Sequence, residues 1–296
     1  MKSLIFSKPV IWGLSGVLVA TGVGGYVWVQ EHRPPLLEMY VFSMKQGNAI
    51  LIRTPDDRRV LINGGGNAEI VRHIGAVLPF YSRRIDMVIA TDTQKKNTGG
   101  LADLSGRYDI GEAVVPAVTL ETLGFATSTD ATYTEFLRTL RRARVPIREV
   151  VSGESLVLGQ DQDGVKIYAS IMFPASQAEF VYSKASPPSI VLDLLYSSTQ
   201  IVVAGDITPK IQRHIMGHSS STGSVDVLIV SHSASADHFN QDFLDMLDPE
   251  YLVYSQSVSR SSGNAVVPYE RRFNTKEKTI KIVSDGSSVD IERVDN

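Results

Sequence analysis

The residues of this chain that suggest chemistry most clearly are two acids and a histidine, Asp92, Asp206 and His232. Carboxylate and imidazole groups are the side chains that bind zinc in proteins. Asp92 follows an apolar run at residues 85–90, which predicts a buried strand that leads into a polar loop. The same loop carries Lys96, whose ammonium group would repel a metal ion. Asp92, Asp206 and His232 are thus possible metal ligands, and Lys96 argues against a metal ion beside Asp92.

Composition limits the chemistry further. The chain has 296 residues, a net charge of −3 and no cysteine. Thiolate metal sites, disulfides and a cysteine nucleophile are thereby excluded. The small acidic charge provides no global field that would attract nucleic acid.

The N-terminus predicts a membrane anchor. Residues 10–29 form an uncharged apolar run long enough to cross a bilayer as a helix. Lys2 and Lys8 precede the run, so we expect residues 1–9 in the cytoplasm, a single pass through the cell membrane, and an extracytoplasmic domain. A cleaved signal peptide is the main alternative.

Hydrophobic periodicity predicts a mixed α/β domain between residues 36 and 294. Helices are expected at 68–78, 132–144, 208–216 and 240–247. Strands are expected at 37–42, 49–53, 60–63, 85–90, 114–116, 150–158, 165–172, 190–196, 200–204, 225–230, 251–255, 279–283 and 288–292. This order favours two packed sheets with helices outside, an αββα sandwich, preceded by one transmembrane helix.

Several blocks in the same order resemble the metallo-β-lactamase domain of ComEC-type competence and DNA-uptake proteins. They are Met44 to Ile50, Val60 to Gly66, Ile85 to Thr91 with Gly99-Gly100-Leu101, Ser189 to Leu192, Val203 to Ile207, Val225 to His232, Asp248 to Tyr251, and Ser284 to Gly286. The resemblance implies a metallo-β-lactamase-like sandwich. The channel part of those proteins has no counterpart here, so DNA uptake itself is not implied.

The resemblance also places the metal ligands, and this chain departs from them. The four ligand positions of the loop fall on Asp92, Gln94, Lys96 and Asn97, and only Asp206 and His232 match elsewhere. Asn48 and Asn63 stand where the family has aspartate, and Ser233 stands where it has histidine. Active members use two metal ions to cleave a phosphodiester. The departures imply a chain with no metal, no cofactor and no catalytic residues.

Loss of the metal predicts a substitute charge. A carboxylate buried at Asp206 needs a cation, and Lys95 and Lys96 are the candidates. We expect the ammonium of Lys96 to pair with Asp206 or Asp92. Asp206 keeps an alternative interpretation as a bridging metal ligand, and His232 as a remaining ligand or a polar core residue.

Other polar groups have ordinary interpretations beside their functional ones. His214 and His218 lie four residues apart, as zinc ligands do on a helix, but surface histidines are the simpler interpretation. Asp237-His238 is expected to lie in a loop or helix cap. The basic cluster is either a solvated helix face or a phosphate or partner site, and it comprises Arg138, Arg141, Arg142 and Arg144.

The sequence therefore favours a membrane-anchored protein without enzymatic activity. It would act as a binding or scaffold component of a cell-envelope complex, with other membrane or envelope proteins as partners and no small-molecule substrate. The alternatives are a metal-dependent phosphodiesterase or nuclease that uses Asp92, Asp206 and His232, and a DNA-binding module, which the net charge disfavours.

Overall fold

The computed structural model describes residues 35–117, 131–176, 188–218, 223–230, 240–254 and 267–295. The chain divides into two compact units, residues 1–35 and 36–296, and the second contains nearly all described residues. Within the described ranges no helix is long and apolar enough to cross a membrane. The span expected at residues 10–29 lies outside these ranges and stays a prediction.

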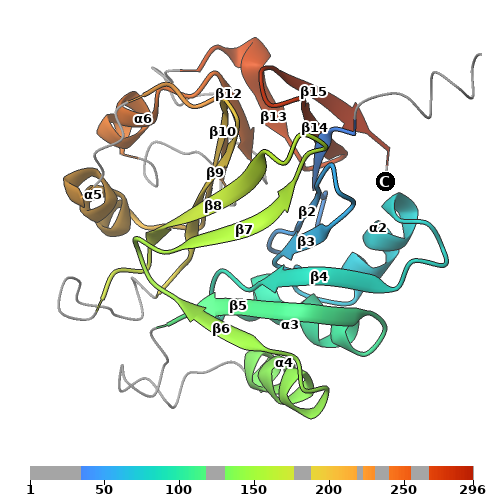
Figure 1. Ribbon diagram of the computed structural model, residues 1–296. Coiled ribbons are helices and arrows are strands. Elements are labelled where there is room, and N and C mark those ends of the chain that lie inside the picture. The colour runs from blue at the N-terminus through green and yellow to red at the C-terminus, as the bar shows by residue number, and fades with distance from the viewer. Residues whose placement is uncertain are drawn as a thin grey trace, which may run out of the picture. The chain divides into compact units, whose positions relative to one another are not determined.

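The first sheet of the second unit contains both antiparallel and parallel strands (Figure 1). Its order across the described part of the chain is β15 (Val289–Val294), β14 (Thr279–Ser284), β1 (Leu37–Val41), β2 (Ile50–Arg53), β3 (Arg59–Ile62), β4 (Arg84–Ile89), β5 (Asp109–Pro116) and β6 (Ile147–Val150). The strands from β15 to β3 pair antiparallel. The strands from β3 to β6 pair parallel. The helices α2 (Glu69–Val77) and α3 (Lys95–Ser105) connect the parallel strands.

The second sheet is built in the same mixed way. Its order is β13 (Arg272–Asn274), β12 (Tyr251–Tyr254), β11 (Val227–Val230), β10 (Thr199–Gly205), β9 (Val191–Tyr196), β8 (Lys166–Phe173) and β7 (Ser155–Gln160). The strands expected at 190–196 and 200–204 are confirmed, and they form a hairpin because β9 and β10 pair antiparallel. The strands from β10 to β13 are parallel.

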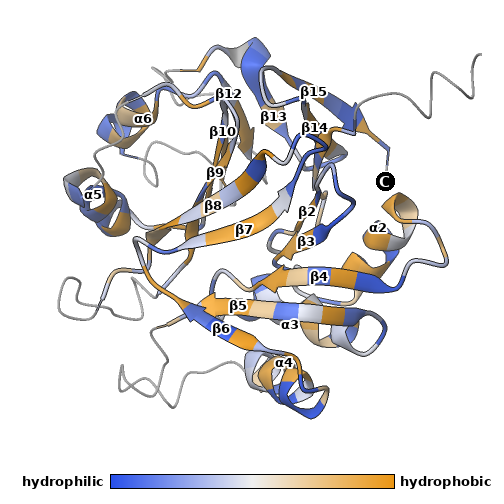
Figure 2. Cartoon of the chain, viewed as in Figure 1, coloured by the Kyte–Doolittle hydropathy of each residue, from blue (hydrophilic) through white to orange (hydrophobic). Residues whose placement is uncertain are grey.

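Three hydrophobic clusters define the layers. One cluster joins the inner faces of the two sheets, with alternate residues such as Leu37, Met39 and Val41 pointing into it. A second packs helices α2, α3 and α4 (Ala131–Arg142) on the first sheet. The third packs α5 (Pro209–His218) and α6 (Gln241–Leu247) on the second sheet. Figure 2 shows hydrophobic residues concentrated along the strands that these layers bury.

These layers form the expected αββα order, consistent with a metallo-β-lactamase-like sandwich. All residues of the three clusters lie between residues 37 and 282. The core formed by the described residues therefore lies within the second unit.

The strand expected at 150–158 is wrong. The chain turns at Gly153, which has a φ of +89°, and makes two strands that belong to different sheets. Apolar residues on both sides of the turn, Val150 and Leu156, suggested one continuous strand. The sequence also gave no signal for β13 or for the short 3-10 helix at Tyr269–Arg271.

The polar segment at 91–100 is not a loop throughout, because α3 begins at Lys95. Its two glycines lie inside the helix, where the backbone of residues 64–67 approaches them. A Cβ added at Gly99 would lie 2.3 Å from the carbonyl oxygen of Gly66, and one at Gly100 would lie 2.1 Å from that of Gly64. Glycine is thus required here by close packing rather than by a turn. Helix α5 ends at His218, two residues beyond the end expected at residue 216.

Candidate functional site

The candidate site lies where strands of both sheets end. β3 leads to Asn63, β4 leads through Ala90 and Thr91 to Asp92, and β10 leads to Asp206. The parallel pairing of β3 and β4 brings their carboxyl ends to one edge of the first sheet. The amide of Ile190, which precedes β9, donates to the carbonyl of Thr91 at 2.7 Å and links the second sheet to this edge.

Two asparagines and a threonine form a buried amide network at this edge. The Nδ2 of Asn63 donates to Oδ1 of Asn48 at 2.6 Å and to Oγ1 of Thr91 at 2.8 Å. Its Oδ1 accepts from the amide of Thr91 at 2.9 Å. Asn63 has a φ of +59°, a conformation that asparagine tolerates better than most residues. Asn48 and Asn63, which stand where the resemblance would place aspartates, are therefore held by hydrogen bonds of their side-chain amides.

Asp92 is enclosed by hydrogen-bond donors. Its side chain is 2% exposed and accepts from the backbone amide of Gln94 at 2.9 Å and from Nδ2 of Asn97 at 2.7 Å. Burial raises the pKa of the Asp92 carboxyl to about 6, although these hydrogen bonds and the charge of Lys96 oppose the shift. Hydrogen-bond donors around Asp92 therefore stabilise its charged form, whereas burial destabilises it.

An ion pair joins the two sheets beside Asp92. The Nζ of Lys96, in the first turn of α3, contacts Oδ2 of Asp206, which follows β10. The side chains are 29% and 20% exposed. This is the contact that the sequence led us to expect for Lys96, whereas Lys95 is exposed. That the lysine replaces a metal ion stays a prediction.

One polar atom of the site has no hydrogen-bond partner among the described residues. The Oδ1 of Asn97 is buried and unpaired, because its Nδ2 faces the carboxylate of Asp92. The turn at Gly47 packs on this group: a Cβ there would lie 2.9 Å from Oδ1 of Asn97 and 1.6 Å from the carbonyl oxygen of Lys96. A second buried polar group, the hydroxyl of Tyr133, has a raised pKa because of burial and the nearby charges of Glu149 and Asp92.

These groups do not fit a pair of divalent ions. A metal ion needs lone pairs directed at it, yet Asn97 turns an N–H donor toward Asp92, and Lys96 places an ammonium on Asp206. Within the described ranges, no three His, Asp or Glu residues are placed to hold a metal ion.

The remaining candidates lie apart from this edge or outside the described residues. His232, Ser233 and Asp237-His238 lie in the undescribed range 231–239. His214 and His218 do face one another on α5, with ring centroids 4.2 Å apart. Three arginines of the basic cluster, Arg138, Arg141 and Arg142, are exposed on α4, where Glu135 pairs with Arg138 and Arg142. The fourth, Arg144, is exposed just after the helix ends.

Sequence reasoning did not find the roles of Thr91, Asn97 and Tyr133. The resemblance identified Asn97 only as a changed ligand position. No sequence pattern predicted that its side-chain amide would donate a hydrogen bond to the Asp92 carboxylate. Tyr133 is a buried residue of α4 that no sequence pattern singled out.

Comparisons with known proteins give matches among solved structures. No family model matches the chain, and no curated protein matches it. Solved structures similar to it include a mutant of the CmlA β-hydroxylase (16% identity, 75% of this chain, TM-score 0.48), the short form of human tRNase Z (13%, 80%, 0.43) and the Rm3 metallo-β-lactamase (17%, 69%, 0.43). The matches cover 46%, 97% and 77% of those chains, so this chain spans less than half of CmlA.

The similarity is low in each case, with sequence identities of 13–17% and TM-scores of 0.43–0.48. The finer resemblance to ComEC-type domains stays a prediction.

Proposed function

We propose that this chain is a catalytically degenerate member of the metallo-β-lactamase fold that acts by binding another protein. The observation that carries the proposal is the Lys96–Asp206 ion pair. A cation that belongs to the protein lies on a carboxylate which, by resemblance, would otherwise bind a metal. Core packing does not depend on the metal ligands, so a sandwich of this kind persists after its chemistry is lost.

The rest of the edge supports the same conclusion. The amides at Asn48 and Asn63 bond to one another, and Asp92 is surrounded by donors. The amides at positions 48 and 63 and the lysine at position 96 each have a partner that suits them, as in a structural polar network. The proposal extends to location: residues 10–29 anchor the domain outside the cytoplasm, and its partner is another membrane or envelope protein.

An assay of phosphodiester hydrolysis tests the proposal. The purified unit 36–296 is expected to give no hydrolysis of bis(p-nitrophenyl) phosphate above the protein-free rate with zinc or manganese added. The variant Asp206→Ala should behave identically. A rate that is present in the wild type and lost in Asp206→Ala would instead establish a metal-dependent phosphodiesterase.

Crosslinking in native membranes tests the binding half. The full chain is expected to give discrete higher-mass species that contain a second polypeptide and resist nuclease. Nuclease-sensitive species would favour the DNA-binding alternative, and the absence of any crosslinked species would contradict a scaffold role.

A further inference from the structure

The turn that joins α2 to β4 exposes two neighbouring aromatic rings. Phe80 is 88% exposed and Tyr81 is 75% exposed. The amide of Ser82 donates to the carbonyl of Pro79 at 2.8 Å, so the rings lie at the tip of a tight turn. The rings contact one another edge to face, with centroids 5.4 Å apart. Adjacent exposed rings with a polar rim are typical of interaction surfaces.

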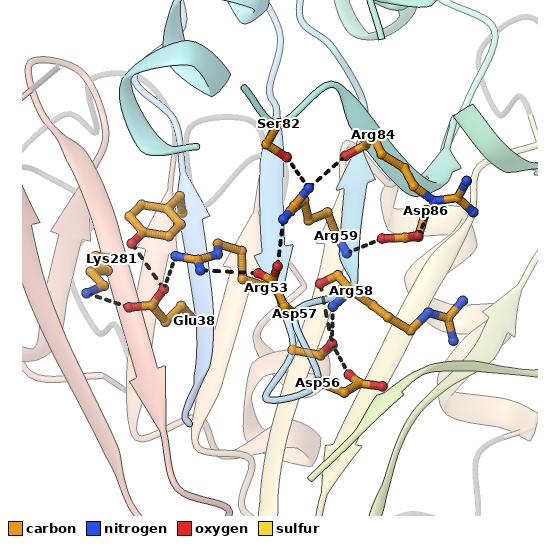
Figure 3. Close-up of polar contacts among 12 residues, drawn as sticks. Glu38, Arg53, Asp56, Asp57, Arg58, Arg59, Ser82, Arg84, Asp86 and Lys281 are labelled. Atoms are coloured by element: carbon orange, nitrogen blue, oxygen red, sulfur yellow. Dashed lines mark hydrogen bonds and ion pairs between the residues drawn. The ribbon is translucent and has the colours of Figure 1, made fainter. Parts of the chain in front are cut away.

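The turn is fixed to the sheet on both sides. The guanidinium of Arg59 bonds to the hydroxyl of Ser82 and to the carbonyl of Arg84, as Figure 3 shows. The amide of Asp109, at the start of β5, donates to the carbonyl of Arg83 at 2.7 Å. These bonds hold the flanks of the turn, so the rings are presented outward by a built support rather than by a loose loop.

Arginines form much of the rim. Arg83 and Arg107 are exposed, and the side chain of Arg84 is 64% exposed while it pairs with Asp86. The acids beside them are Asp86, which is partly buried, and Asp109, which is exposed, so three arginines against two aspartates leave a small positive excess. Guanidinium groups bind phosphate oxygens in pairs of parallel hydrogen bonds. The surface thus combines apolar rings with groups suited to phosphate.

The strand directions place this surface at the edge where the domain begins. β1 and β3 are both antiparallel to β2, and β3 is parallel to β4, so Leu37 and Arg84 start strands at the same edge. The apolar run at 10–29, which the sequence predicts to cross a membrane, ends shortly before Leu37. Asp92 follows the opposite end of β4. The aromatic turn therefore lies at the edge of the first sheet where β1 begins.

We propose that this edge docks on a phospholipid bilayer. Phe80 and Tyr81 insert at the headgroup level, where aromatic rings are favoured, and Arg83 and Arg107 bind lipid phosphates. Docking of this edge leaves the Asp92–Lys96 edge directed away from the lipid and open to a partner. A bilayer is proposed as the partner because a membrane span is predicted at residues 10–29. The aromatic and arginine surface does not depend on the proposed loss of catalysis.

Vesicle sedimentation of the unit 36–296, which contains the core formed by the described residues and lacks the predicted span, tests the proposal. The unit should bind vesicles of phosphatidylcholine mixed with phosphatidylglycerol. The double variant Phe80→Ser/Tyr81→Ser should lower the partition coefficient about tenfold, and Arg83→Gln/Arg107→Gln should lower it severalfold. Tyr168→Ser, which removes a ring 40% exposed on β8, is the matched control and should leave binding unchanged.

All substituted side chains are exposed, so the variants should melt at the same temperature as the wild type. Measuring the melting temperatures checks that the variants are folded. Wild-type protein that stays in the supernatant would overturn the proposal, as would equal binding by the Phe80→Ser/Tyr81→Ser variant. Binding of single-stranded DNA that the same substitutions abolish, without vesicle binding, would assign the surface to nucleic acid and also overturn it. None of these outcomes changes the hydrolysis result, so the two proposals fail separately.

Discussion

Replacing Gly99 by alanine is expected to destabilise the domain by about 3 kcal/mol or more, a cost at the upper end for overpacking. The added Cβ would lie 2.3 Å from the carbonyl oxygen and 2.6 Å from the carbonyl carbon of Gly66. Both atoms belong to the backbone segment that precedes α2 and cannot turn aside as a side chain does. Helix α3 would have to move away, and with it Lys96 and Asn97.

Gly75→Ala provides the matched control. Gly75 also lies inside a helix, α2, but no atom lies within 4 Å of the position of its Cβ. Alanine should therefore stabilise the domain there by about 0.5–1 kcal/mol, because glycine loses more backbone freedom on folding. Urea unfolding of both variants measures the two free energies. Equal effects of the two substitutions would contradict the packing of α3 on residues 64–67.

Lys96→Met is expected to cost about 2–3 kcal/mol and Asp206→Asn about 1–2 kcal/mol, between the values for exposed and fully buried pairs. The asymmetry follows from the neighbours. Without the ammonium, the carboxyl groups of Asp206 and Asp92 lose a cation that lies near both of them. Without the Asp206 carboxylate, Lys96 still has Asp92 nearby and is 29% exposed to solvent.

The double variant should cost less than the sum of the single ones by about 1–2 kcal/mol, the coupling expected for residues in contact. Glu250→Gln is the control, because it breaks an exposed pair with Arg271 at 3.5 Å, and it should change stability by less than about 0.5 kcal/mol. Additive effects of Lys96→Met and Asp206→Asn would show that the pair does not join the sheets as described.

The sequence predicted most of the sandwich because its strands are apolar runs between turn residues. It missed α3 because that helix buries polar residues, Asn97 and Thr98, and has two glycines in its middle. Local propensity disfavours such a helix. Only the approach of residues 64–67, distant along the chain, explains why the glycines are there.

At the candidate site, the ion pair was predictable from charge and the amide network was not. A partly buried lysine needs a carboxylate nearby, and the resemblance placed Asp206 close to Lys96. The bonds among Asn48, Asn63 and Thr91 depend on which way each amide turns, and the sequence does not encode this locally. The orientation of Asn97 toward Asp92 has the same origin in three-dimensional packing.

Metal content tests the central claim most directly. The purified unit 36–296 is dialysed against zinc or manganese, then against metal-free buffer, and the bound metal is measured by mass spectrometry. A lysine that has replaced the metal predicts far less than one equivalent, with the same low value for Asp206→Asn. Retention of about two equivalents, the stoichiometry of two-metal hydrolases, would contradict it, as would one equivalent that Asp206→Asn removes.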